Sequence, residues 1–187
     1  MPKPEVDQIQ EDIDSSKERA ATLVRLLFTG ALSLAAWQDS MEQEIVDQYI
    51  RSYQLGRGGI PAMTEADWNK VNDLVQAQYK YLAQFALEVG ALSEAVAAAR
   101  AGLYMQSAMQ AYSTGQQQKI GGGALVLPAH PGDGSTACGV NCRCEWRIVE
   151  RRDGGWNCAW DVDANAESCE DCLKRGSEWN PLVVMPQ

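Results

Sequence analysis

Apolar residues recur at helical spacing through most of the chain before residue 120. A first helix is predicted to run from Ser15 or Ser16, either of which can cap it, to about Trp37. Gly30 lies in the middle of this helix and weakens it by about 1 kcal/mol. Its apolar positions are Leu23, Leu26, Leu27 and Leu34. Residues 1–15 are acidic and contain prolines, and we expect them to form a flexible arm.

A second helix is predicted to begin at Asp39, because Glu42 three residues later completes a capping-box pattern. Its apolar stripe is Met41, Ile45, Tyr49 and Tyr53. The run LGRGGIP at residues 55–61 contains the glycines and proline that end a helix, so it predicts a turn.

Two more helices follow in the middle of the chain. Thr64 and Asp67 form a capping pair for the first, which Gly90 ends. Its apolar positions are Trp68, Val71, Val75, Leu82, Phe85 and Val89. The next helix is expected from Ser93 to Gly115, and its many alanines permit close packing against a neighbouring helix.

Beyond the glycine run at residues 121–123 the pattern changes from helical spacing to alternation and turn signals. The predicted elements are a short extended segment at 125–127, a strand at 144–149, a hairpin turn at 153–155, a strand at 156–162, a short helix or turn at 168–176 and a strand at 182–184. The sequence therefore predicts an α+β protein: a mainly helical N-terminal body and a small Cys-rich β-ribbon, zinc-ribbon-like, at the C-terminus. We expect a flexible arm at 1–15, a helical domain at 16–120 and the Cys-rich β module at 121–187.

Cysteine is confined to that C-terminal module. All six cysteines lie between residues 138 and 172, and four of the six tryptophans lie there or directly after. A module of about 50 residues is too small to be stabilised by its core alone, and such modules commonly rely on a metal or on disulfides.

The cysteine spacing favours a structural zinc site. Zinc is held tetrahedrally by four soft ligands, which two loops usually supply as two close pairs. The first pair is Cys138 with Cys142 or Cys142 with Cys144, and the second is Cys169 with Cys172. The candidate metal ligands are therefore Cys138, Cys142, Cys144, Cys169 and Cys172. Five sulfurs exceed four positions, so at least one is spare, and Cys158 is the most isolated of the six.

Three other uses of these cysteines stay open. They are disulfides in a mature extracellular particle, plain reduced thiols, and a redox centre at the C-x-x-C motif, although the βαβ surroundings of a thioredoxin-like motif are missing. His130 is the only histidine and is a further candidate ligand, although a His-Pro pair before a glycine-rich turn is typical of a loop residue. A Cys–His nucleophile pair would need His130 beside a thiol, and nothing in the sequence places it there.

Charge and composition exclude several classes. The formal net charge is −9 and no segment is basic, so a specific nucleic-acid partner is not expected. The acidic N-terminus has no apolar signal region, and the apolar stretch at 23–37 is too short to cross a bilayer. We therefore expect synthesis in the cytoplasm, which disfavours disulfides, and no membrane association. No phosphate-binding loop, dinucleotide-binding motif or zinc-protease motif is present, so an enzyme is not expected.

The order of several segments resembles phage minor head proteins of the Mu F-like head-morphogenesis family. The resemblance covers roughly residues 40–187. Its most specific part is PGDGSTxCxxNCxCxW at 131–146, followed by CxxC at 169–172 and WxPL at 179–182. The family's best-known ending, His-Pro-x-Cys-Arg-Cys, matches Asn141-Cys142-Arg143-Cys144 in part, whereas His130 lies well upstream of it. Larger members of the family carry further domains.

The resemblance implies a structural, non-enzymatic protein of the phage head, made in the host cytoplasm. It implies contacts with the portal or the major capsid protein, and several copies in a symmetric assembly. A capsid-surface or vertex protein of the cement type is one alternative. A zinc-ribbon module that binds another protein is an alternative of a different class, and a cysteine-dependent redox enzyme is a third.

Overall fold

The computed structural model describes residues 5–164 and 167–187, so the first four residues of the expected arm lie outside it. The chain forms two compact units. The helical unit extends up to Ser52 and includes Thr64–Ala108, and the cysteine unit comprises Tyr53–Met63 and Met109–Gln187. The sequence-based boundary at 121–123 differs from this division, because the cysteine unit also contains the helix before it. The α+β fold class predicted from the sequence is confirmed.

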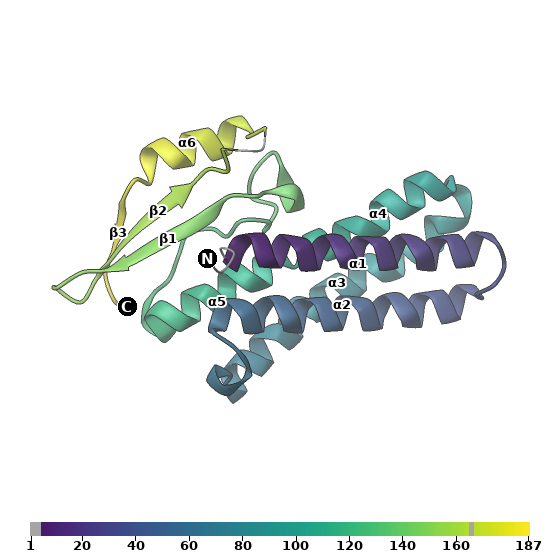
Figure 1. The fold of residues 1–187 in the computed structure, drawn as a ribbon, viewed down its shortest axis with the longest axis horizontal. Coiled ribbons are helices and arrows are strands. Elements are labelled where there is room, and N and C mark those ends of the chain that lie inside the picture. Colours follow the sequence, from purple (N-terminus) through teal and green to yellow (C-terminus); the bar gives the residue numbers. More distant parts are fainter. Residues whose placement is uncertain (1–4, 165–166) are drawn as a thin grey trace. The chain divides into compact units, whose positions relative to one another are not determined.

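The helical unit contains the helices α1 (Glu5–Phe28), α2 (Leu34–Arg57), α3 (Glu65–Glu88) and α4 (Glu94–Gln106), the last turn of α2 extending into the cysteine unit. Figure 1 shows α1 and α2 side by side and antiparallel, as the ion pair between Arg19 and Glu44 also indicates (2.8 Å). Aromatic rings fill the interior, with Trp37 edge-on to Phe85 and Phe85 stacked on Tyr104. Among the described residues, no helix combines the length and the apolarity needed to cross a membrane.

The predicted capping signals of α3 and α4 are confirmed. The Thr64 side chain accepts a hydrogen bond from Asp67 N–H, and Asp67 accepts one from Thr64 N–H, which completes the capping box. Ser93 accepts a hydrogen bond from Val96 N–H at the start of α4. The expected continuous helix 93–115 is wrong, since α4 ends at Gln106 and α5 begins at Met109.

The predicted first two helices are also wrong in their limits. Helix α1 starts at Glu5, about ten residues earlier than expected, because Ile9 and Ile13 are fully buried and extend its apolar face. Gly30 does not lie inside a helix but follows the end of α1. It adopts a φ of 73°, and its N–H donates a hydrogen bond to the Leu27 carbonyl oxygen. Helix α2 then begins at Leu34, so Asp39 lies inside it rather than at its cap.

In the cysteine unit, the end of α2 crosses α5 (Met109–Gly121) at two glycines. A Cβ atom on Gly56 would lie 2.1 Å from the Tyr112 carbonyl oxygen, and one on Gly115 would lie 2.3 Å from the Tyr53 carbonyl oxygen. The two backbones are therefore in direct contact, which only glycine permits.

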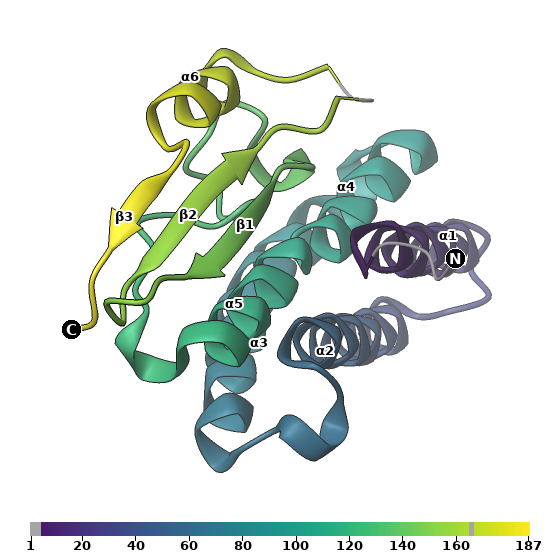
Figure 2. The same ribbon diagram turned by 60° about the vertical axis from the view of Figure 1, so that its left-hand side comes forward.

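The rest of the cysteine unit is a three-stranded antiparallel sheet and one helix, and Figure 2 shows the strands in the order β1-β2-β3. The elements are β1 (Glu145–Glu150), β2 (Trp156–Asp161), α6 (Glu170–Glu178) and β3 (Leu182–Val184), close to the four elements predicted. The hairpin turn is closed by a hydrogen bond that Arg151 N–H donates to the Gly155 carbonyl oxygen at 2.8 Å. Within the turn, Gly154 has a φ of 83°. Residues 125–127 alternate in burial as expected of a strand, but they do not join this sheet.

The core of the cysteine unit is built on tryptophan. Trp146 and Trp160 are almost fully buried and meet edge-to-face at 5.2 Å, and Trp179 stacks on Trp146 at 5.5 Å. Helix α6 packs closely against the end of β2, because a Cβ on Gly176 would lie 2.8 Å from the Val162 side chain and 3.4 Å from the Trp160 carbonyl oxygen. Such aromatic clusters supply much of the buried area in a small domain.

We expect Gly115→Ala to lower the free energy of unfolding by about 1–3 kcal/mol or more, because the methyl group meets backbone that cannot give way. The matched control is Gly102→Ala, another mid-helix glycine whose Cβ would lie at an ordinary 3.5 Å from the Lys17 side chain. This control should raise the same quantity by up to about 1 kcal/mol through helix propensity. Urea unfolding followed by circular dichroism measures both, and equal effects in the two variants would refute the close crossing.

Candidate metal centre

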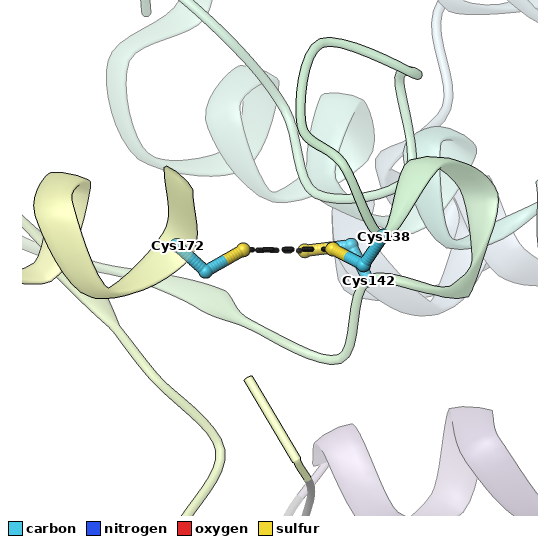
Figure 3. Close-up of side chains that lie close together, drawn as sticks. All are labelled: Cys138, Cys142 and Cys172. Carbon is cyan, nitrogen blue, oxygen red and sulfur yellow. Dashed lines mark hydrogen bonds between the residues drawn. The ribbon is translucent and has the colours of Figure 1, made fainter. Parts of the chain in front are cut away.

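Three cysteine sulfurs converge in the cysteine unit. The Sγ atoms of Cys138, Cys142 and Cys172 lie within 4.8 Å of one another. Cys172 Sγ is 3.6 Å from both of the others, and Figure 3 shows the three side chains pointing toward one another. In a tetrahedral zinc site with zinc–sulfur bonds of about 2.3 Å, neighbouring sulfurs lie about 3.8 Å apart. The spacing of the three thiols therefore fits one metal ion.

Local backbone structure aims these side chains. Cys138 and Cys142 flank a single 3-10 turn at Gly139–Asn141, which folds the chain so that both thiols face one point. Cys172 lies in the first turn of α6 and is directed inward as the helix's buried residue. Cys169 is the N-cap residue of α6, and its backbone is extended. The close pairs that the sequence predicted are therefore formed by a turn and by a helix start.

The other two predicted ligands lie at the edges of this cluster. Cys169 Sγ is 3.5 Å from Cys138 Sγ, and Cys169 is also hydrogen-bonded to Cys172. Cys144 is hydrogen-bonded to Cys142 and Cys172. The structure thus brings all five predicted cysteines together around Cys172, with three of them at the centre.

Hydrogen bonding and burial shift the pKa values of these thiols in opposite directions. The thiol of Cys144 donates to Cys142 and, with the Cys144 backbone N–H, lowers the pKa of Cys142 to about 5. Burial alone would raise the pKa of Cys169, but the backbone N–H groups of Cys172 and Cys138 outweigh it and lower that pKa. Burial raises the pKa of Cys172 and is the main cause of the raised pKa of Cys138. The pKa values of Cys142 and Cys169 are thus lowered and those of Cys138 and Cys172 raised, and a bound metal would deprotonate the latter pair.

The loop that carries Cys138 is tied to α6 by two side chains. Asp171 accepts a hydrogen bond from Ala137 N–H at 2.7 Å. Arg175 donates to the carbonyl oxygen of Ser135 at 2.9 Å and to its hydroxyl at 3.0 Å. The Arg175 guanidinium also lies about equally far from the Trp160 and Trp179 rings, 5.0 and 5.1 Å from their centres. These contacts hold the two ligand segments together, and nothing in the sequence pattern had indicated them.

Two candidate residues serve other purposes. His130 is not part of the thiol cluster: its Nδ1 is 3.0 Å from the Ser113 hydroxyl, and its backbone N–H donates to Asp133 at 2.7 Å. This is the loop role that its sequence context suggested. Cys158 is fully buried among the apolar residues of the sheet, and burial raises its pKa to about 11. It behaves as a small core residue, as its isolation in the sequence had suggested.

The thiol cluster is part of the same core as the tryptophans. Cys142, Cys144 and Cys172 are at most 4% exposed and pack in one apolar cluster with Trp146 and Trp160. A metal bound there would be shielded from water and would join the loop to α6 through the centre of the unit. Comparison with known proteins assigns no relationship, as no family model, curated protein or solved structure matches the chain.

We expect Cys172→Ser to abolish tight binding of a divalent metal, because Cys172 contacts every other thiol of the cluster. Cys158→Ser is the matched control, since it removes an equally buried sulfur from the same unit. It should leave one bound ion per chain. Metal content after gel filtration measures both, and metal binding that survives in Cys172→Ser would disprove this placement of the site.

Proposed function

We propose that the thiol cluster is a structural zinc site that stabilises the cysteine unit. The observation that carries this proposal is the convergence of Cys138, Cys142 and Cys172 at sulfur–sulfur distances suited to one tetrahedral ion. Cys169, which has two backbone N–H donors and lies next to Cys138, supplies the fourth thiolate. Backbone N–H groups directed at sulfur stabilise the charge of a metal-bound thiolate.

The donor set favours zinc over other metals. All-sulfur tetrahedral sites select zinc or iron–sulfur clusters, whereas oxygen ligands suit magnesium and calcium. An iron–sulfur cluster places several iron and sulfide atoms between its cysteines and so holds their sulfurs much farther apart. Contacts of 3.5–3.6 Å leave room for a single ion only.

The physical role of the ion follows from the small size of the elements around it. The three-stranded sheet and the nine-residue α6 bury too little apolar surface to be securely stable by themselves. Zinc adds a cross-link between the 138–142 loop and α6, and such sites contribute directly to folding free energy. A purely structural centre uses four of the five clustered cysteines and requires no catalytic step.

For the whole chain we propose a structural role in a phage head, as a minor head protein that contacts the portal or the major capsid protein. The support is the order of motifs over residues 131–146, 169–172 and 179–182. Those motifs carry the residues that build the metal centre and its tryptophan core. A zinc-stabilised interaction module that never enters a particle is the rival function.

Protein purified under reducing conditions without added metal should contain one zinc ion per chain. A zinc chelator should expose the tryptophan core, shifting the fluorescence emission to longer wavelength and opening the cysteine unit to proteases, while most helical circular dichroism remains. A calcium-selective chelator serves as the control and should change nothing. A chain with six free thiols and no bound metal would refute the zinc site. A chain whose cysteines form disulfides would instead support the disulfide alternative.

The role in the head predicts that the chain remains in purified particles of the phage or prophage that encodes it. Quantitative mass spectrometry should find a small, fixed number of copies relative to the major capsid protein. A copy number close to that of the capsid protein would instead support the cement-type alternative. Absence from particles would leave the interaction-module alternative.

A further inference from the structure

The metal centre has one sulfur more than a tetrahedral ion can bind. Five cysteines are joined by sulfur contacts, whereas zinc takes four ligands in a structural site. Cys138, Cys142 and Cys172 form the common face of the cluster. The identity of the fourth ligand is therefore a choice between Cys169 and Cys144.

The two remaining sulfurs lie on different edges of this triangle. Cys169 is in contact with Cys138 and Cys172, and Cys144 is in contact with Cys142 and Cys172. Each of the two therefore contacts Cys172 and one further sulfur of the central three. Both are tethered to a central ligand, Cys144 two residues after Cys142 and Cys169 three residues before Cys172. Tethering keeps each at a high effective concentration beside the ion.

The local backbone directs both Cys144 and Cys169 toward the cluster, but it leaves the two side chains with different exposure. The backbone at Cys142 is extended, and side chains two residues apart on extended chain point to the same side, so Cys144 follows Cys142 toward the cluster. Cys169 occupies the helix cap of α6 with a partly exposed side chain, while Cys144 is only 4% exposed. The fourth position therefore has one partly exposed candidate and one buried candidate.

We propose that Cys144 and Cys169 are alternative fourth ligands of one ion, so that the site exchanges a ligand without releasing the metal. The proposal rests on the metal-binding function proposed above. In the exchange, the bond from the ion to Cys169 breaks as the bond to Cys144 forms. Cys144 loses its thiol proton, and the released Cys169 thiolate takes one up, so charge and protons balance. The partly exposed Cys169 thiol becomes available to other molecules while the ion stays in the core.

Cobalt substitution tests the exchange, because the intensity of thiolate-to-cobalt charge-transfer absorption grows with the number of bound thiolates. The variants are Cys144→Ala, Cys169→Ala and the double variant, with Cys158→Ala as the matched control. We expect each single variant and the control to bind one ion with a four-thiolate spectrum. The double variant should show a three-thiolate spectrum and an affinity lower by at least about a hundredfold, more than the loss of an outer-shell contact causes.

Two results would overturn the exchange. A three-thiolate spectrum in Cys169→Ala, with an unchanged Cys144→Ala, would make Cys144 a neighbour rather than a ligand. The reverse pattern would remove Cys169 from the site. Failure of the wild-type chain to bind cobalt at all would instead refute the proposed metal-binding function, so the two failures are distinguishable.

A measurement on the wild-type chain avoids any folding defect of the variants. Brief treatment of the zinc-loaded protein with iodoacetamide should alkylate Cys169 first, and native mass spectrometry should find the singly alkylated chain with its zinc retained. Zinc loss in proportion to Cys169 alkylation would overturn the proposal, because Cys144 would then not replace the lost ligand.

Discussion

The cysteine unit depends on the meeting of two chain segments at Cys172. This sulfur lies 3.6 Å from Cys138 and from Cys142, so it connects α6 to a loop 30 residues or more earlier in the chain. Asp171 and Arg175 hold the same two segments together with hydrogen bonds to the loop backbone. Without this junction, α6 would be attached to the rest of the unit mainly by its packing on Trp160 and Trp179. The sulfur cluster is therefore part of the core that the sheet and α6 share.

Burial and hydrogen bonding shift the pKa values of the thiols at this junction in opposite directions. Thiols in an apolar core resist ionisation, and burial raises the pKa of Cys172 for that reason. Hydrogen bonds lower the pKa of Cys142 and of Cys169 and so favour their thiolate forms. A divalent cation is the natural partner for such a set, because it neutralises several thiolates at once in a site that excludes water. The proposed structural zinc follows from this balance.

The helical unit has a core without cysteine. Its core is a conventional apolar interior, with Trp37, Phe85 and Tyr104 in direct ring contact. In the other unit, two helices approach closely where Gly56 lies against the Tyr112 backbone and Gly115 against the Tyr53 backbone. A head-assembly role would use both kinds of part: a rigid cross-linked module and helical faces able to pack on neighbours. That role rests on the motif order, and the metal centre is compatible with it.

The sequence by itself determined the local elements and the candidate ligands. The hairpin around Gly154, the capping box of Thr64 and Asp67 and the helix that starts after Cys169 all depend on contacts only a few residues apart. The three cysteines whose sulfurs converge, Cys138, Cys142 and Cys172, are among the five candidate ligands. Tertiary structure alone decided that Cys172 contacts the other cysteines of the cluster, that Cys144 is hydrogen-bonded to Cys142 and Cys172, and that Cys158 belongs to the apolar core. It also decided where α1 begins, since Ile9 and Ile13 are helical because they are buried against partners distant in sequence. Patterns of spacing report which residues share a face, whereas distances between segments depend on packing that no local pattern records.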